Sequence, residues 1–465
     1  MSDARTIALQ YAHEHRDQFL EDLQEFLKIP SISTDPAHQS DMMQAAEWLV
    51  FKLKSMGVQK AKIFPTPGHP IVYGEYRAAG SSASTVLIYG HYDVQPPDPL
   101  VLWQTPPFEP VIQGNQLFAR GSSDMKGQIL ATLAAVESVQ SAGRFPVNIK
   151  FLFEGEEEIG SPNLPAFLDK NKNLLSSTVA LNPDAGMISA DLPTIVYSLR
   201  GLDFFEIQVF GPDHDLHSGL FGGVIHNPAQ VLCDLIAGMH DSHGKVTLPG
   251  FYDKVRPLQE AERNELSRLP SQEEFYYKQT GVGALWGEEC YSIVERVGAR
   301  PTLEVNGLLS GFIGEGQKTI IPSSAMAKIS TRLVPDQNPA EVHQQMLKYM
   351  EVNAPKSVKW TVKLLSSGAA GITDRNQPAT IALEKALESV WGVQPVYKRE
   401  GGSIPVVADM QRYLGIDSVL TGFGLPDDNI HSPNEKLHLS PWKKGIDALV
   451  NFFYNMEANK EIDQK

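Results

Sequence analysis

The sequence predicts an α/β fold, in which a larger domain with a mostly parallel sheet carries an inserted, smaller α+β domain. Continuously apolar runs at residues 86–90 and 147–153 enclose a helical pattern at residues 127–143. Apolar strands joined by a helix are typical of a parallel sheet that is covered on both faces. Near Gly201 apolar and polar residues begin to alternate, which predicts the second domain.

Two helices are expected before the first strand. One has leucine and phenylalanine side chains on a single face between residues 20 and 27 and ends close to Pro30. The other covers residues 42–56. Two further apolar runs, at residues 178–181 and 418–424, predict additional strands of the same sheet.

The inserted domain is expected to combine strands and helices. Residues 202–211 and 325–335 alternate in polarity, which indicates strands with one wetter face. Between them Asn227 is a suitable N-cap and Pro228 a suitable first residue for an amphipathic helix. The remaining elements expected here are a helix at residues 341–350 and a strand at residues 358–365.

These patterns assign residues 1–200 and 368–465 to the larger domain and residues 201–367 to the inserted domain. The formal net charge of −15 argues against nucleic-acid binding, which requires a basic surface. Because the sequence shows neither a long apolar run nor an apolar N-terminal segment, we expect a cytoplasmic protein with no membrane partner. Two cysteines are too few for a disulfide framework.

Residues capable of metal binding and acid–base chemistry follow each of the apolar strands. In open α/β sheets the ligand crevice lies outside the carboxyl ends of the strands, so separate segments deliver these side chains to one edge. The residues concerned are His91, Asp93, Asp124, Glu154, Glu156, Glu157, Glu158, Asp184 and His431.

This combination of residue types indicates a hydrolytic centre with two metal ions. Imidazole and carboxylate ligands suit zinc, manganese or cobalt. Two ions that share a bridging carboxylate polarise a water molecule between them. A further glutamate that is not a ligand could accept the proton of that water and pass it to the leaving amine.

Six motifs occur in a fixed order along the chain. They are GHYDVQP at residues 90–96, GSSDMKG at 121–127, EGEEEIGS at 154–161, DLHSG at 215–219, EGGSIP at 400–405 and HSPNEK at 431–436. Together they resemble metallopeptidase family 20, and most closely the branch of carnosinase and cytosolic non-specific dipeptidase. The resemblance extends from about residue 20 to the C-terminus.

The resemblance implies which residues bind the first metal ion. His91 corresponds to a ligand, and Asp93 to the carboxylate that orients its imidazole. Asp124 corresponds to the carboxylate that bridges both ions, and Asp184 to a second acidic ligand of the ion bound by His91. Members of this family often have a cis peptide bond after the bridging aspartate, so we expect one between Asp124 and Met125.

For the second ion, the resemblance implies Glu158 and His431 as ligands, and Glu157 as the general base. The order of base and ligand within residues 156–158 depends on the alignment through Gly160 and the serine that follows it. A shift of one position would reassign both roles, and Glu156 would then be the first alternative for the general base.

The resemblance also implies residues that contact the substrate. His217 corresponds to a histidine that enters the active site of the partner subunit and stabilises the oxyanion. Arg332 corresponds to the residue that binds the substrate carboxylate, a task suited to a bidentate guanidinium. Further contacts to that carboxylate are expected from Thr319, Gly402, Ser403 and Asn306.

We therefore expect a dinuclear metal-dependent dipeptidase that hydrolyses short peptides with a free C-terminal carboxylate through a metal-bridging hydroxide. The larger domain would be the catalytic domain, and the inserted domain would serve as lid and as the dimerisation unit of a homodimer. Two divalent ions are expected, with zinc as the first choice and manganese as the second. An N-acyl amino acid hydrolase or a carboxypeptidase of the same family is the alternative. A third hypothesis is a metal-binding scaffold that has lost activity, although the expected base and ligand positions all carry competent residues.

Overall fold

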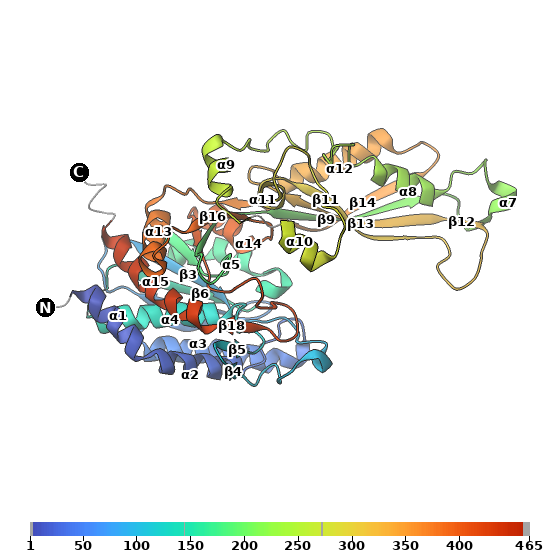
Figure 1. Cartoon of the computed structure of the whole chain (residues 1–465). Helices are drawn as coiled ribbons and strands as arrows, with labels where there is room; N and C mark the ends of the chain where they lie inside the picture. Colours follow the sequence, from blue (N-terminus) through green and yellow to red (C-terminus); the bar gives the residue numbers. More distant parts are fainter. Residues whose placement is uncertain (1–2, 144, 271–272, 459–465) are drawn as a thin grey trace. The chain divides into compact units, whose positions relative to one another are not determined.

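The computed structural model describes residues 3–143, 145–270 and 273–458 (Figure 1). The chain divides into two compact units. The first comprises the residues up to Tyr197, then Thr373–Lys398 and the residues from Asp409 onward, and the second comprises Ser198–Ile372 and Arg399–Ala408. Residues 399–408, which we expected in the catalytic domain, therefore group with the second unit.

The first unit contains the mixed, mostly parallel sheet that was expected. Strand β3 pairs in parallel with β6 on one side and with β7 on the other, and β7 pairs in parallel with β17. Strands β6 and β7 are buried along their whole length, which explains why most of their side chains are apolar. In sheet order the strands are β1 (Lys62–Phe64), β2 (Ile71–Tyr76), β6 (Asn148–Glu154), β3 (Thr85–His91), β7 (Val179–Asn182), β17 (Ser418–Leu420) and β8 (Thr194–Leu199).

Helix α4 (Lys126–Ser141) lies at the centre of the helical layer of this unit. It is buried on all sides because α1, α2 and α15 pack around it. The other helices are α1 (Ala4–Glu14), α2 (Arg16–Leu27), α3 (Gln39–Ser55), α5 (Leu164–Lys170), α6 (Lys172–Leu175), α13 (Pro378–Trp391) and α15 (Leu439–Ala458). A small antiparallel sheet consists of β4 (Val111–Gln113), β5 (Gln116–Phe118) and β18 (Lys436–His438).

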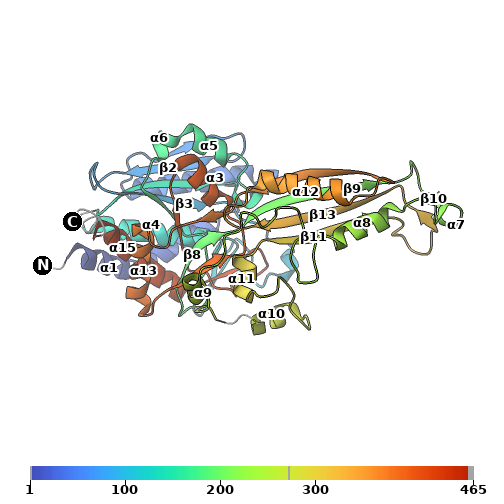
Figure 2. The same cartoon turned by 90° about the horizontal axis from the view of Figure 1, so that it is seen from above.

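The second unit is built on an antiparallel sheet with the order β11-β13-β9-β14. Every second residue of β9 and β13 is buried, and helices α8 and α12 pack on that face (Figure 2). Asn227 caps α8 as expected, since its side chain accepts a hydrogen bond from the N–H of Ala229. The elements are β9 (Gly201–Phe210), β11 (Thr302–Ser310), β13 (Ser324–Leu333), β14 (Lys359–Gly368), α8 (Pro228–Ala237) and α12 (Pro339–Asn353).

Shorter elements complete this unit. Strands β10 and β12 pair with each other beyond the ends of β9 and β13, where α7 also lies. The short elements of this unit are β10 (Leu216–His217), β12 (Ile320–Ile321), β15 (Gly371–Ile372), α7 (Ser218–Phe221), α9 (Glu260–Leu266), α10 (Glu273–Thr280) and α11 (Ile293–Gly298). Strand β16 (Val396–Glu400) and helix α14 (Pro405–Asp409), like β8, contain residues of both units.

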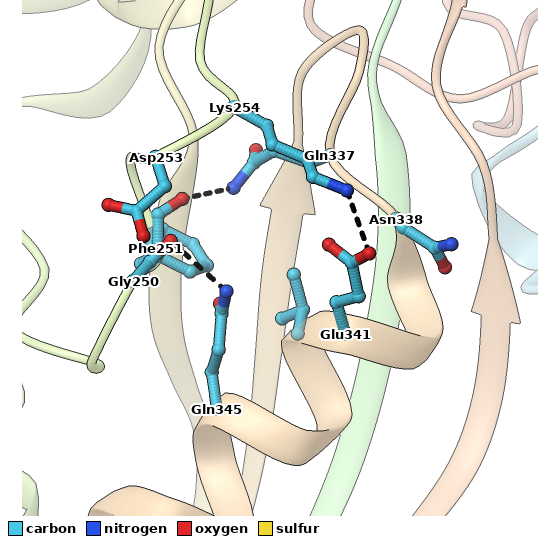
Figure 3. Close-up of a pocket in the computed structure, with 9 residues that line it drawn as sticks. Gly250, Phe251, Asp253, Lys254, Gln337, Asn338, Glu341 and Gln345 are labelled. Atoms are coloured by element: carbon cyan, nitrogen blue, oxygen red, sulfur yellow. Dashed lines mark hydrogen bonds and ion pairs between the residues drawn. The ribbon is translucent and has the colours of Figure 1, made fainter.

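Hydrogen bonds tie the loop at residues 250–254 to the start of α12 (Figure 3). Gln337 Nε2 donates to the carbonyl oxygen of Phe251 over 2.7 Å, and Gln345 Nε2 donates to that of Gly250 over 3.1 Å. Lys254 and Glu341 form an ion pair beside a small cavity of about 100 Å³. These hydrogen bonds hold the loop against α12, and the charge of Lys254 beside the cavity is paired with that of Glu341.

The helices and strands expected from the sequence are present, with small shifts at their ends. Two differences are larger. The run at residues 418–424 is a strand only over Ser418–Leu420. The strand expected at residues 358–365 extends to Gly368 as β14 and is followed by β15. Across the described ranges, no helix is both long and apolar enough to span a membrane. Both cysteines are free and exposed.

Candidate metal centre

Two groups of potential metal ligands meet in the first unit and share one residue. His91, Asp124 and Asp184 form one group, and Asp124, Glu158 and His431 form the other. Within each group the ligand atoms all lie within 4.8 Å of one another. The structure thus brings together all five residues that were expected to bind metal.

Four of these residues follow the end of a strand or precede the start of a helix, and His431 lies in the turn before β18. His91 is the last residue of β3, and Asp184 follows the end of β7. Glu158 lies in the short 3-10 turn that follows β6, and Asp124 lies just before α4. Because β3, β6 and β7 run in parallel, their carboxyl ends meet at one edge of the sheet.

The first group is arranged around the buried imidazole of His91. Its Nε2 lies 3.1 Å from Oδ1 of Asp124 and 3.9 Å from Oδ1 of Asp184. On the other side of the ring, Nδ1 lies 3.1 Å from the carbonyl oxygen of Asp93 and 3.4 Å from its Oδ1. Asp93 also accepts hydrogen bonds from the N–H groups of Glu157 and Glu158, so it links the histidine to the acidic turn.

The second group is more open to solvent. Nε2 of His431 lies 2.8 Å from Oδ2 of Asp124 and 3.3 Å from Oε2 of Glu158. Gln95 Nε2 donates to the same Oε2 over 2.8 Å. Oε1 of Glu158 is buried, and it has no hydrogen-bond partner among the described residues. An orphaned carboxylate oxygen within a set of imidazole and carboxylate donors is what a divalent cation would satisfy.

The pKa values indicate how strongly the acids of this cluster repel one another. Burial raises the pKa of Glu157 to about 9 and that of Asp184 to about 7, with His91 opposing both shifts and neighbouring carboxylates contributing to them. Burial also opposes ionisation of Asp124, but hydrogen bonds from His431 and His91 outweigh it and hold the pKa of Asp124 below its ordinary value. Divalent cations would relieve this crowding of negative charge, so the residues present fit the expected metal ions.

The three consecutive glutamates have different surroundings. Glu156 is buried, and its Oε1 accepts hydrogen bonds from the N–H of His69 and from Nδ2 of Asn163. Glu158 faces His431. No hydrogen bond to the carboxylate of Glu157 occurs among the described residues, which leaves that group available for proton transfer. These surroundings favour Glu157 over Glu156 as the base.

A fully buried carboxylate, Glu435, organises the loop that carries Asp124. Its Oε1 accepts hydrogen bonds from the N–H groups of Ser123 (3.0 Å) and Asp124 (3.1 Å). Its Oε2 accepts from the N–H of Gly121 (2.9 Å) and from the Arg120 guanidinium (2.7 Å). Glu435 was not among the residues expected to act at the site, although it lies within the HSPNEK motif.

The backbone around this loop is closely packed. The peptide bond between Asp124 and Met125 is cis, as expected. A Cβ atom at Gly127 would lie 2.1 Å from the carbonyl oxygen of Ser122, so only glycine fits at this point. Trp442 Nε1 donates to the carbonyl oxygen of Gly127 over 2.8 Å. These contacts restrict where the carboxylate of Asp124 can lie.

We expect Glu435→Gln to weaken metal binding by about 10- to 100-fold, because an amide cannot accept all the hydrogen bonds of the loop and leaves Arg120 without its partner charge. The measurement is competition between the metal-free protein and a chelator for zinc. The exposed Glu47 on α3 provides the control Glu47→Gln. An unchanged zinc affinity in a folded Glu435→Gln protein would exclude a positioning role for Glu435.

The residues of the second unit that were expected to contact the substrate lie in two separate regions. Arg332 donates from its guanidinium to Oγ of Ser403 over 2.9 Å, and the carbonyl oxygen of Gly402 accepts from the N–H of Arg200. Asn306 is exposed in a bulge of β11 and lines the same cavity as Arg332. Arg332, Ser403 and Asn306 therefore belong to one region.

His217 and Thr319 belong to another region of the same unit. His217 pairs with Ile320, and the N–H of Ser218 donates to the carbonyl oxygen of Thr319 over 3.1 Å. These residues lie beyond the Ser324 end of β13, whereas Arg332 is near its other end. Eight residues of strand correspond to roughly 26 Å at about 3.3 Å per residue. One chain therefore does not bring Thr319 and Arg332 to the same small substrate.

The chain is similar to known proteins over most of its length. The family model described as Peptidase family M20/M25/M40 matches residues 87–455. The Cys-Gly metallodipeptidase DUG1 of Candida albicans is 32% identical over 466 residues, which cover 95% of each protein. The human Beta-Ala-His dipeptidase is 31% identical over 467 residues, or 96% of this chain and 92% of that protein.

A solved structure described as an M20 family metallo-carboxypeptidase, Sso-CP2 from Sulfolobus solfataricus, is also similar. It is 34% identical in sequence, with a TM-score of 0.84. The match covers 95% of this chain and 99% of that chain. Sequence and fold thus agree over nearly the whole length.

Proposed function

The chain belongs to peptidase family M20/M25/M40, and we propose that within this family it is a dinuclear metal-dependent dipeptidase. The observation that carries the proposal is the pair of ligand groups that share Asp124. Both relatives are named as dipeptidases, which supports dipeptides as the substrate class. Zinc is the metal we propose, with manganese as the alternative, since both suit imidazole and carboxylate ligands.

His91, Asp124 and Asp184 would hold one ion, and Asp124, Glu158 and His431 the other. Bound divalent ions supply Lewis-acid polarisation of a peptide carbonyl and lower the pKa of water. Asp93 orients the His91 ring through the contacts at Nδ1.

Other residues carry out proton transfer and substrate binding. Glu157 accepts the proton of the attacking water and returns it to the leaving amine. Arg332, Ser403 and Gly402 bind the free carboxylate of the substrate, with Asn306 beside them. This requirement for a free carboxylate favours short peptides over protein chains.

We propose that His217 and Thr319 act on the substrate of a partner subunit in a homodimer that forms through the second unit. Their separation from Arg332 along β13 supports this role, because residues at the two ends of this strand in one chain are too far apart to contact the same dipeptide. The imidazole of His217 would stabilise the oxyanion formed during hydrolysis. The cytoplasmic location expected from the sequence stays a prediction.

Hydrolysis of a small panel of compounds tests the activity. Chelator-stripped protein is assayed before and after addition of zinc or manganese, with free dipeptides, N-acetylated dipeptides and N-acetyl amino acids. We expect metal-restored cleavage of the free dipeptides only. Cleavage of the acylated compounds would instead support an acylase or a carboxypeptidase. Of these two activities, the name of the similar solved structure favours the carboxypeptidase. No turnover with two bound ions would identify an inactive scaffold.

Two inactive variants test the role of His217. We expect Glu157→Gln and His217→Ala to be inactive alone and to regain activity when both chains are co-expressed, because a mixed dimer contains one site with both native residues. Random pairing would give about a quarter of the wild-type activity in a symmetric dimer. Absence of recovery in purified mixed dimers would show that His217 acts within its own chain.

A further inference from the structure

The second unit contains a cavity of about 410 Å³ next to the residue proposed to bind the substrate carboxylate. Arg332 lines it, together with three more arginines. One of these, Arg300, is neutralised, because it forms two hydrogen bonds of 2.7 and 2.6 Å with the carboxylate of Glu288. The other two are Arg200 and Arg296.

These three remaining guanidinium groups have no carboxylate partner within ion-pair distance among the described residues. Arg332 donates to the hydroxyl group of Ser403, and Arg200 donates from Nε to the carbonyl oxygen of Gly401. Nε of Arg296 is buried without any hydrogen-bond partner. Since all three side chains are half-buried, their positive charges are incompletely solvated and incompletely paired.

Acidic residues nearby do not cancel this positive charge. Glu304 lines the cavity but is exposed to solvent. Burial and the proximity of Arg332 lower the pKa of Arg200 to about 10, although Glu400 and Glu304 act in the opposite direction. The cavity therefore presents a positive potential to any group that enters it.

The walls of the cavity also offer apolar surface and a fixed position for Arg296. Trp286 and His240 both line it, with their rings in edge-to-face contact at 5.3 Å. A Cβ atom at Gly287 would lie 3.0 Å from Cδ of Arg296, so the arginine packs directly on the glycine backbone. A side chain with methylene groups and a terminal anion would match these surfaces.

We infer that this cavity binds the side chain of the C-terminal residue of the substrate and favours an acidic one, aspartate or glutamate. The inference rests on the proposed function, in which Arg332 binds the α-carboxylate. That contact occupies one guanidinium group and leaves Arg296 and Arg200 for a second carboxylate. Arg296 is the specificity-determining residue, because its Nε has no other hydrogen-bond partner.

Kinetics with matched dipeptides tests this subsite. Metal-loaded protein is expected to hydrolyse Ala-Glu with a kcat/KM about tenfold above that for Ala-Gln, which has the same shape without the charge. In Arg296→Met this ratio should fall to about one. The exposed Lys359 on β14 does not line the cavity, so Lys359→Met provides a control with the same change of charge and should keep the ratio.

A binding measurement separates this inference from the proposed function. Calorimetry on the metal-free protein should show L-glutamate binding more tightly than L-glutamine, and Arg296→Met should remove the difference. Equal hydrolysis of both dipeptides, or equal binding of both amino acids, would overturn the acidic subsite and leave the dipeptidase proposal intact. Failure to hydrolyse any free dipeptide would overturn the dipeptidase proposal.

Discussion

Replacing Glu157 with glutamine should lower kcat by about 10²- to 10⁴-fold while two metal ions remain bound. A glutamine side chain has nearly the same shape but cannot accept a proton, and loss of a general base costs a rate factor of this size. The metal ligands are other residues, so metal binding should be retained. The measurements are steady-state kinetics with a free dipeptide and metal quantification on the same sample.

The neighbouring glutamate provides a matched control. Glu156→Gln changes the same functional group one residue away, but Glu156 is held by the N–H of His69 and by Asn163. We expect less than about a tenfold change in kcat for this variant. If Glu156→Gln were inactive and Glu157→Gln active, the base would be Glu156 and the assignment of the acidic turn would shift by one residue.

Asp124→Asn should weaken binding at both metal positions, by at least about 100-fold, because Asp124 belongs to both ligand groups. An amide carries no negative charge to place between two cations. Zinc binding is measured by chelator competition, and thermal unfolding with excess zinc should show a smaller stabilisation than in the wild type. Activity should be lost together with the metal.

Two further variants make this result specific. Asp184→Asn changes a residue that belongs to one group only, so we expect weaker binding of one ion and retention of the other. Asp191 is exposed and belongs to neither group, so Asp191→Asn should bind two ions normally. Two ions bound with wild-type affinity to Asp124→Asn would contradict a shared ligand.

The sequence alone predicts much of the first unit because its signals are local. Residues 86–90 and 147–153 are mostly apolar and are buried along their whole length, as is typical of strands covered on both faces. The end of each strand then locates a chemically active residue, such as His91 or Asp184. Because parallel strands end at one edge, these residues are expected to meet even though they are far apart in the chain.

Other features depend on contacts that no local pattern encodes. Glu435 lies in a recognisable motif, but its hydrogen bonds to residues 121–124 connect segments more than 300 positions apart. Residues 399–408 group with the second unit through contacts such as that between Arg332 and Ser403. Arg296, on a six-residue helix, has no feature in the sequence that distinguishes it from a surface arginine.

The sequence by itself determined the α/β class, the order of the motifs and the set of residues available for metal binding. Those follow from side-chain chemistry and from the periodicity of burial along one segment. Only the tertiary structure decided the distances within the two ligand groups, that Glu156 is held elsewhere, and that three arginines without acidic partners line one cavity. Distances between side chains from separate segments decide those points, and such distances exist only after the chain has folded.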